Sequence, residues 1–220
     1  MIITIDGPVA SGKSSVAQLL AERLGFYHVN TGLLYRAVAY VECEKLSLEA
    51  ALDDISSITY TFQNGQPVVQ YRLQDITPYL KEARFDQAAS RVSANPLVRK
   101  ALLEVQHAMG KKFNIIADGR DCGSVVYPDA DYKFFLTAPL KTRTVRMAKY
   151  LCQKTGKIQD VAAIGAHIAE RDTRDSERAI APLCVPAGAI VIDNGEMTIE
   201  QTVDVMVGYI KINNKKEKQP

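Results

Sequence analysis

The segment GPVASGKS, residues 7–14, constrains the fold more than any other part of this chain. It matches the pattern Gly-x-x-x-x-Gly-Lys-Ser/Thr and stands between a buried-strand pattern, MIITID (residues 1–6), and an amphipathic helical pattern (14–24). In that context the glycines let backbone N–H groups turn inward, and the start of the helix adds a positive dipole end. The sequence therefore predicts a loop that binds the phosphates of a nucleoside triphosphate.

Three polar side chains complete this predicted phosphate site. Lys13 can reach the β- and γ-phosphates, and Ser14 can hold Mg²⁺. Asp118 ends an apolar strand pattern and is the candidate for a second acidic group near the metal, although an aspartate that only caps a strand is equally compatible with the sequence. The residues expected to contact the triphosphate are Gly7, Pro8, Val9, Ala10, Ser11, Gly12, Lys13, Ser14 and Ser15.

Short apolar runs alternate with helical patterns along most of the chain. This alternation predicts an α/β fold with a five-stranded parallel sheet flanked by helices. Between residues 58 and 96 the pattern changes to a hairpin around Asn64-Gly65, followed by a helix from Thr77, which indicates an inserted small sheet-plus-helix subdomain. The five strands are expected at residues 1–6, 26–29, 113–118, 132–138 and 189–193.

These patterns also suggest how the chain is divided. We expect one core built from residues 1–57 and 97–212, with the insertion at 58–96 between its two parts. The polar, glycine-bearing stretch 153–160 lies between two helical patterns and is the candidate for a short lid, and residues 213–220 are expected to form a flexible tail.

Charge and cysteine content exclude several classes of function. The 27 basic and 25 acidic residues give a net charge of +2, but four lysines and one glutamate fall in residues 211–220. The basic excess thus belongs to the tail, so we expect no nucleic-acid binding. The four cysteines and three histidines are too scattered for a zinc site, and no signal peptide or membrane span is evident, so we expect a cytoplasmic protein that does not bind membranes.

Two arginine-bearing stretches point to an anionic acceptor. Gly119-Arg120-Asp121 follows the end of a predicted strand, where open α/β sheets place their ligands. In ERDTRDSER (170–178), helical spacing puts Arg171, Asp175 and Arg178 on one face. Ordinary helix salt bridges, Arg171 with Asp175 and Glu170 with Arg174, explain the second stretch equally well.

Taken together, these residues resemble the bacterial cytidylate kinases, a family of P-loop nucleoside monophosphate kinases. The resemblance covers nearly the whole chain, and the insertion at 58–96 is similar to that family's enlarged monophosphate-binding subdomain. It rests on GPVASGKSS (7–15), NTGLLYRA (30–37), AASRVS (88–93) with a downstream arginine, IADGRDCGSVVYPDA (116–130) and ERDTRDSERAIAPL (170–183).

The resemblance implies an enzyme that uses ATP and Mg²⁺ to phosphorylate CMP or dCMP, and we expect it to be a monomer. Lys13, Arg120 and Arg178 are then the catalytic residues, and Ser14 and Asp118 the metal-site residues. Matching positions imply that Arg36, Arg120 and Arg178 bind the acceptor phosphate, that Arg171 and Asp175 contact the sugar, and that Ser90, Arg99 and Asp121 contact the cytosine, with Thr31 and Asp118 also at the acceptor site.

Some questions stay open at the level of sequence. Thr31, Leu33 and Ser124 depart from the commonest family pattern, and we expect them to alter substrate affinity at most. A P-loop kinase for another small acceptor, such as uridylate or shikimate, a regulatory GTPase and a nucleotide-sensing module without turnover remain alternatives. Arg143 and Arg146 could face the ATP phosphates or simply lie on a solvated helix.

Overall fold

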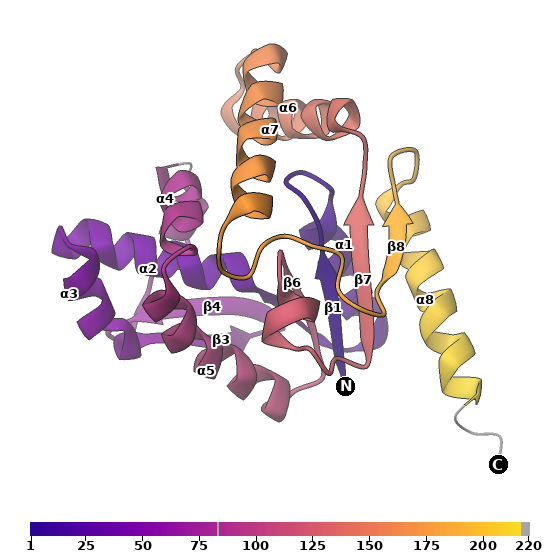
Figure 1. Cartoon of the computed structure of the whole chain (residues 1–220), viewed down its shortest axis with the longest axis horizontal. Helices are drawn as coiled ribbons and strands as arrows, with labels where there is room; N and C mark the ends of the chain where they lie inside the picture. Colours follow the sequence, from indigo (N-terminus) through magenta and orange to yellow (C-terminus); the bar gives the residue numbers. More distant parts are fainter. Residues whose placement is uncertain (83, 217–220) are drawn as a thin grey trace.

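The computed structural model describes residues 1–82 and 84–216 of the chain. Its centre is a five-stranded parallel sheet in the order β2-β6-β1-β7-β8 (Figure 1), which confirms the predicted α/β class. Each predicted strand is present, with its limits shifted by at most two residues. The strands are β1 (Ile2–Asp6), β2 (Tyr27–Asn30), β6 (Ile115–Gly119), β7 (Tyr132–Thr137) and β8 (Ile190–Asp193).

Helices cover both faces of this sheet and bury one apolar cluster on each side. On one face, Val16 and Leu20 of α1 pack with Val203 and Met206 of α8 against β1 and β7. The other face packs against α2, α5 and the inserted segment. The helices are α1 (Lys13–Leu24), α2 (Thr31–Lys45), α3 (Leu48–Asp53), α4 (Arg84–Val92), α5 (Pro96–Lys112), α6 (Leu140–Thr155), α7 (Val161–Glu177) and α8 (Ile199–Lys216).

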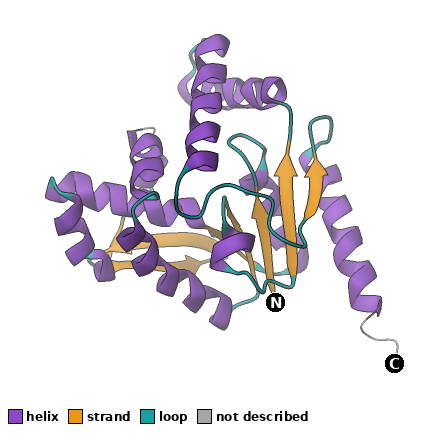
Figure 2. Cartoon of the chain, in the orientation of Figure 1, coloured by secondary structure: helices purple, strands orange, loops and turns teal. Residues whose placement is uncertain are grey.

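The insertion contains a small antiparallel sheet, β3 (Ile58–Gln63), β4 (Gln66–Tyr71) and β5 (Gln74–Asp75), whose long strands run across the direction of β1 and β7 (Figure 2). Asn64 and Gly65 have φ angles of 51° and 77°, as the predicted tight hairpin turn requires. The helix does not begin at Thr77 as expected. Thr77 is instead bonded to the backbone of Val69 in β4, and α4 begins at Arg84.

The structure describes the candidate lid, residues 153–160, and part of the expected tail, residues 213–220. Residues 153–160 contain the end of α6, Gly156 with φ of 67° and the link to α7. Helix α8 continues to Lys216, so residues 213–216 of the expected tail are helical, and 217–220 lie outside the described residues. Within residues 1–82 and 84–216, no helix combines the length and the apolar character needed to cross a membrane.

The backbone at the end of β1 is tightly packed against β7. A Cβ atom on Gly7 would lie 2.1 Å from the carbonyl oxygen of Leu136 in β7, so the chain can leave β1 here only as glycine. The fully buried Asp6 carboxylate accepts the N–H groups of Cys122 (2.8 Å) and Gly123 (2.7 Å), which lie in a turn of π-helix at Cys122–Val126. Asp6 thus ties the start of the phosphate loop to the chain that follows β6.

Replacing Gly7 tests this packing. We expect Gly7→Ala to lower the free energy of unfolding by about 2 kcal/mol, because the added methyl group overlaps a backbone oxygen that cannot move aside. Gly208→Ala in α8 is the matched control. No atom lies within 4 Å of a Cβ at that position, so alanine should stabilise the helix by about 0.5 kcal/mol. Urea unfolding of both variants measures the two effects, and equal changes would contradict the packing argument.

The buried Asp6 carboxyl should make stability depend on pH. Burial raises its pKa from 3.8 to about 6, against the opposing effect of the two N–H bonds. The folded state therefore holds this proton to higher pH than the unfolded state, and the stability that the proton provides is lost as pH rises through 6. Relative to Asp6→Asn, the wild type should lose about 1 kcal/mol of unfolding free energy between about pH 5 and about pH 7. Parallel pH profiles of the two proteins would refute this assignment.

Candidate functional site

The loop between β1 and α1 has the shape of a phosphate cradle. Gly12 has φ of 88° and precedes the first residue of α1, Lys13, so the positive end of the helix opens onto the loop. The Lys13 side chain is only 7% exposed and its Nζ donates to the carbonyl oxygen of Pro8 (3.0 Å). Burial lowers the pKa of Lys13 to about 7, and the positive charges of Arg120 and Arg171 add to this effect. An anion bound beside Lys13 would restore its charge.

Ser14 and Asp118 meet at the mouth of this loop. The Ser14 hydroxyl donates to one Asp118 carboxylate oxygen (2.6 Å), and His28 Nε2 lies 2.7 Å from the other. Burial raises the pKa of Asp118, but the contacts with His28 and Ser14 and the charge of Lys13 outweigh it, so the pKa lies below its usual value. The Thr31 hydroxyl bonds to the Asp118 carbonyl oxygen (2.9 Å) and fixes the backbone there.

This pair of oxygen ligands suits magnesium held together with a nucleotide. Hydroxyl and carboxylate oxygens are the donors that Mg²⁺ prefers, and Mg²⁺ in nucleotide enzymes takes one or two protein ligands, with phosphates and water supplying the rest. The described residues contain no cluster of three or more acidic, histidine or cysteine side chains that could bind a metal by themselves. Ser14 and Asp118 therefore fit a magnesium ion that arrives with its phosphates.

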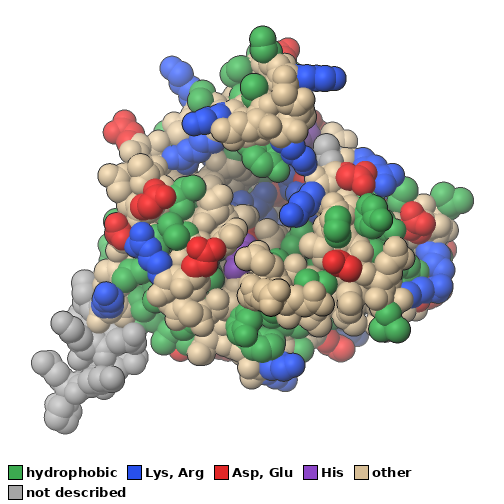
Figure 3. All heavy atoms as spheres, turned by 180° about the vertical axis from the view of Figure 1, so that it is seen from behind, with side chains coloured by type: hydrophobic (Ala, Val, Ile, Leu, Met, Phe, Trp, Pro, Cys, Tyr) green, Lys and Arg blue, Asp and Glu red, His purple; other side chains and the backbone are tan. Residues whose placement is uncertain are grey.

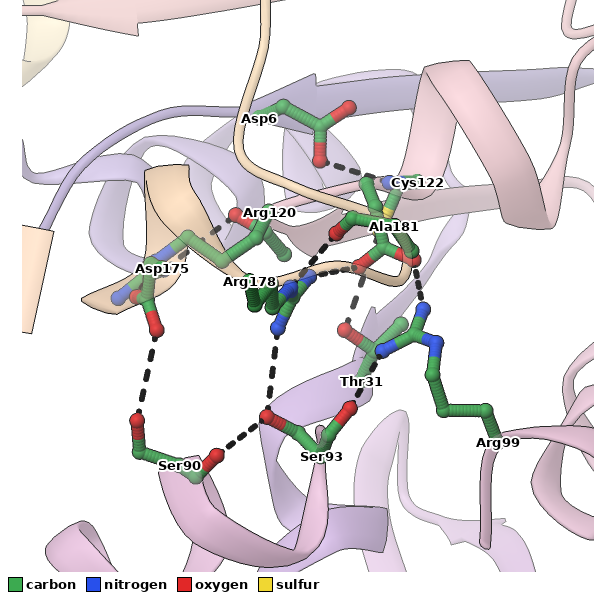
Figure 4. A network of polar contacts seen from close by, with 12 residues as sticks. Asp6, Thr31, Ser90, Ser93, Arg99, Arg120, Cys122, Asp175, Arg178 and Ala181 are labelled. Carbon is green, nitrogen blue, oxygen red and sulfur yellow. Dashed lines mark hydrogen bonds and ion pairs between the residues drawn. The ribbon is translucent and has the colours of Figure 1, made fainter. Parts of the chain in front are cut away.

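Two buried aspartates, Asp121 and Asp175, bind the arginine and serine side chains of a second polar network, which is drawn in Figure 4. Asp121 forms ion pairs with Arg99 and with Arg178 Nη2 (3.2 Å). The two arginines also share Ser93, since Arg99 donates to its carbonyl oxygen (3.1 Å) and Arg178 to its hydroxyl (3.3 Å). Arg178 Nε is held by the Ala181 carbonyl oxygen at 2.6 Å. This network places two guanidinium groups on one carboxylate.

The second aspartate, Asp175, links the α4 segment to the chain after β6. It receives Arg120 Nε at 2.8 Å and the Ser90 hydroxyl at 3.4 Å. The spacing predicted that Arg178 shares a helical face with Asp175. This prediction is wrong, because α7 ends at Glu177 and Arg178 has extended backbone angles. Its side chain reaches the site through the turn at the end of the helix.

Arg171 is the least compensated charge in the site. It does not form the helix salt bridge with Asp175 that the sequence allowed, because Asp175 is bonded to Arg120 and Ser90. Its buried Nε has no hydrogen-bond partner among the described residues. Burial lowers its pKa, and Arg120 is the next largest cause. The other predicted pair, Glu170 with Arg174, forms at the surface with a distance of 2.6 Å.

Arg36 lies at the edge of the same group. It forms an ion pair with Asp86 in α4 and donates to the Leu80 carbonyl oxygen (2.9 Å), and its charge contributes to the lowered pKa of Arg171. The structure thus pairs Arg36, Arg120 and Arg178 each with a different aspartate. Figure 3 shows a central hollow, seen from the face opposite to that of Figure 1, with Lys and Arg side chains deep inside it.

Several residues at the site were not identified from the sequence. His28, which no sequence pattern singled out, contacts Asp118. Asp6 and Asp172 were not distinguished from their neighbours. No local pattern marks Asp172, whereas Asp6 ends β1 at the carboxyl edge of the sheet. Asn194 directly follows β8, and its place at the carboxyl end of a parallel strand is a signal that could have found it.

The sequence left open whether Arg143 and Arg146 face the ATP phosphates or lie on a solvated helix face, and for the buried Arg143 the second alternative is wrong. Arg143 is buried and donates to the carbonyl oxygens of Ala138 (2.9 Å) and Val9 (3.0 Å). Arg146 donates to the Asn194 side chain (3.1 Å) and backbone (2.7 Å). Both arginines are therefore bonded to the protein.

The arrangement as a whole is suited to holding two anions close together. One would lie on the N–H groups of the loop beside Lys13, and the other beside Arg120 and Arg171, whose charges influence Lys13 directly. Since burial makes these cations unfavourable, bound anions stabilise them. A polar wall of Ser90, Asp121 and Asp175 adjoins the second position.

Comparison with known proteins agrees with this geometry. The cytidylate kinase family model matches residues 3–212. Cytidylate kinases from Azotobacter vinelandii and Bdellovibrio bacteriovorus are 39% and 38% identical to this chain, each over 96% of it and over 95% and 98% of their own lengths. The structure of shikimate kinase from Bacteroides thetaiotaomicron shares the fold, with a TM-score of 0.50, 10% identity and coverage of 96% of this chain and 98% of its own. The chain belongs to the cytidylate kinase family.

Proposed function

We propose that this protein transfers the γ-phosphoryl group of magnesium-bound ATP to CMP or dCMP, producing ADP and CDP or dCDP. The observation that carries this proposal is the group of cations around the buried Lys13, which includes Arg120 and Arg171, whose Nε atom has no hydrogen-bond partner among the described residues. A polyanion bound between these cations would stabilise them. Membership of the cytidylate kinase family supports the identity of the acceptor.

The reaction requires alignment and charge compensation more than acid–base chemistry. A phosphate monoester has its second pKa near ~6, so the acceptor is largely dianionic at neutral pH and needs no general base. The bond from the γ-phosphorus to the bridging oxygen of ADP breaks as an acceptor oxygen forms the new bond. Lys13 and Arg120 reduce the repulsion between the two substrates.

Magnesium would supply further positive charge at the phosphates of ATP, held by Ser14 and Asp118. The short distance between these two side chains and the contact of His28 with Asp118 fix the protein part of that site. Their role as metal ligands is supported by the oxygen chemistry of the pair.

The polar wall explains a preference for cytosine. The exocyclic amine of cytosine is a hydrogen-bond donor, whereas uracil has a carbonyl oxygen at the same position. We assign the cytosine edge to Ser90, Arg99 and Asp121, because carboxylate and hydroxyl oxygens accept a bond from the amine. We assign the sugar contact to Arg171 and to Asp175 of this wall, and the acceptor phosphate to Arg36, Arg120 and Arg178.

The free cysteine thiols indicate the compartment in which we expect this reaction. Cys43, Cys152 and Cys184 are exposed free thiols and Cys122 is a buried one. Exposed free thiols are typical of a reducing compartment. We therefore propose that the enzyme works in the cytoplasm, and that it acts as a monomer because the residues assigned to both substrates come from one chain.

Removing the assigned cations tests the proposed reaction. With ATP and CMP, we expect Lys13→Ala to lower kcat/KM about a hundredfold or more, since a charge that stabilises the transferred phosphoryl group is lost. Arg178→Ala should lower kcat/KM for CMP by a similar factor. The control is Arg174→Ala, four residues before Arg178, which removes only a surface ion pair with Glu170 and should keep wild-type activity. A coupled ADP assay measures all three, with thermal unfolding to confirm that each variant folds.

Ser90→Ala tests how the acceptor base is distinguished. The Ser90 hydroxyl contacts Asp175 at 3.4 Å and belongs to the wall assigned to cytosine. Its loss should reduce the ratio of kcat/KM for CMP to that for UMP about fivefold, since one polar contact contributes about 1 kcal/mol. The same enzyme preparation assayed with both nucleotides provides its own control. An unchanged ratio would remove Ser90 from the base site.

A further inference from the structure

Helix α6 carries two arginines, three residues apart, that are linked to the phosphate loop, one directly and one through a second residue. Arg143 contacts Val9 of the loop, and Arg146 contacts Asn194, which in turn contacts Ser11. Val9 and Ser11 are the two neighbours of Ala10. Arg143 and Arg146 therefore act on both flanks of a single residue at the tip of the loop.

Ala10 has an unusual backbone conformation that needs outside support. Its φ angle of 58° lies in the left-handed region, which side chains with a Cβ atom rarely adopt. Residues in such conformations persist where the surrounding structure holds them, and they concentrate at ligand-binding sites. The loop tip therefore has a conformation that its own sequence does not favour.

On the first flank, both backbone polar groups of Val9 are bonded to the helical hairpin formed by α6 and α7. The Val9 N–H group donates to Asp172 in α7 (3.0 Å), and its carbonyl oxygen accepts from Arg143 Nη1 (3.0 Å). Asp172 and Arg143 are bonded to each other at 2.5 Å, and Arg143 Nε is anchored on Ala138 at 2.9 Å. The orientation of the peptide groups at Val9 is thus set from outside the loop.

On the second flank, the Ser11 carbonyl oxygen accepts from the side-chain amide of Asn194 (2.9 Å). Asn194 is only 3% exposed. Arg146 donates to the Asn194 Oδ1 atom at 3.1 Å and to its carbonyl oxygen at 2.7 Å. Because the arginine occupies the oxygen end of the carboxamide, the nitrogen end is directed at Ser11.

We propose that Arg143 and Arg146 are positioning residues that hold Ala10 and the adjoining loop amides in the conformation that receives the ATP phosphates. Arg143 acts directly and together with Asp172 on Val9, whereas Arg146 acts through Asn194 on Ser11. This inference rests on the proposed binding of ATP by the loop. It predicts that the two arginines control the affinity for ATP and leave the affinity for CMP unchanged, because among the described residues neither arginine bonds to a residue assigned to the acceptor.

Equilibrium titration with each nucleotide alone, in the presence of Mg²⁺ and without turnover, tests the first flank. Arg143→Ala should raise the dissociation constant for ATP about tenfold, as expected for the loss of charge-assisted hydrogen bonds, and keep that for CMP within about twofold. Arg143→Lys should be intermediate, since an ammonium group keeps the ion pair with Asp172 but loses the planar fork. The control Lys141→Ala removes one exposed positive charge from the same helix and should change neither constant.

A double-mutant cycle tests the second flank. Arg146→Ala and Asn194→Ala should each weaken ATP binding, and the double variant should bind about as weakly as Asn194→Ala alone, because the arginine acts through the asparagine. Additive effects would overturn the assignment of Arg146.

The outcomes separate this inference from the proposed function. A wild-type protein that does not bind ATP would overturn both. Wild-type binding together with unchanged ATP affinity in Arg143→Ala would overturn the inference alone. Equal losses of ATP and CMP affinity, with a lower unfolding temperature, would show a general structural role for Arg143 and would also overturn it.

Discussion

The electrostatic cost of burying positive charge is the constraint on which the rest of this structure depends. Lys13 is almost fully buried, and burial lowers the pKa of both Lys13 and Arg171, an effect to which the repulsion of the nearby Arg120 adds. The neighbouring aspartates compensate only part of this charge, because Asp121 and Asp175 are already bonded to Arg99, Arg178 and Arg120. Phosphate groups bound at this position, as proposed for the two substrates, would supply the remaining negative charge.

The parallel sheet brings these groups together. The chain leaves β1 into the phosphate loop, β6 into Arg120 and Asp121 just after Asp118, and β8 into Asn194, all at the carboxyl edge of the sheet. Strand β7 contributes its backbone, against which Gly7 packs. Helices α6 and α7 then close over this edge (Figure 1) and supply Arg143, Asp172 and Arg171.

The comparison of sequence and structure shows which signals were local. The five strands, the hairpin at Asn64-Gly65 and the start of α1 at Lys13 were predictable because each depends on the pattern of a few adjacent residues. The prediction of a helix from Thr77 is wrong because the Thr77 side chain bonds to β4. The residues next to Thr77 in the sequence do not reveal that partner. The shared face expected for Arg178 failed for a similar reason, since the helix ends one residue earlier.

The sequence by itself determined the α/β fold, the phosphate loop and the resemblance to the cytidylate kinases. The hydrophobic period, the turn residues and the motif spacing each depend on residues that are close together in the sequence. Only the tertiary structure decided which carboxylate each site arginine pairs with, that His28 contacts Asp118, and that Arg143 and Arg146 bond to other parts of the protein. Some of these contacts join residues far apart in the chain, such as Val9 and Arg143, which are 134 positions apart. Their partners are chosen by the packing of elements at one edge of the sheet, and no local pattern records that choice.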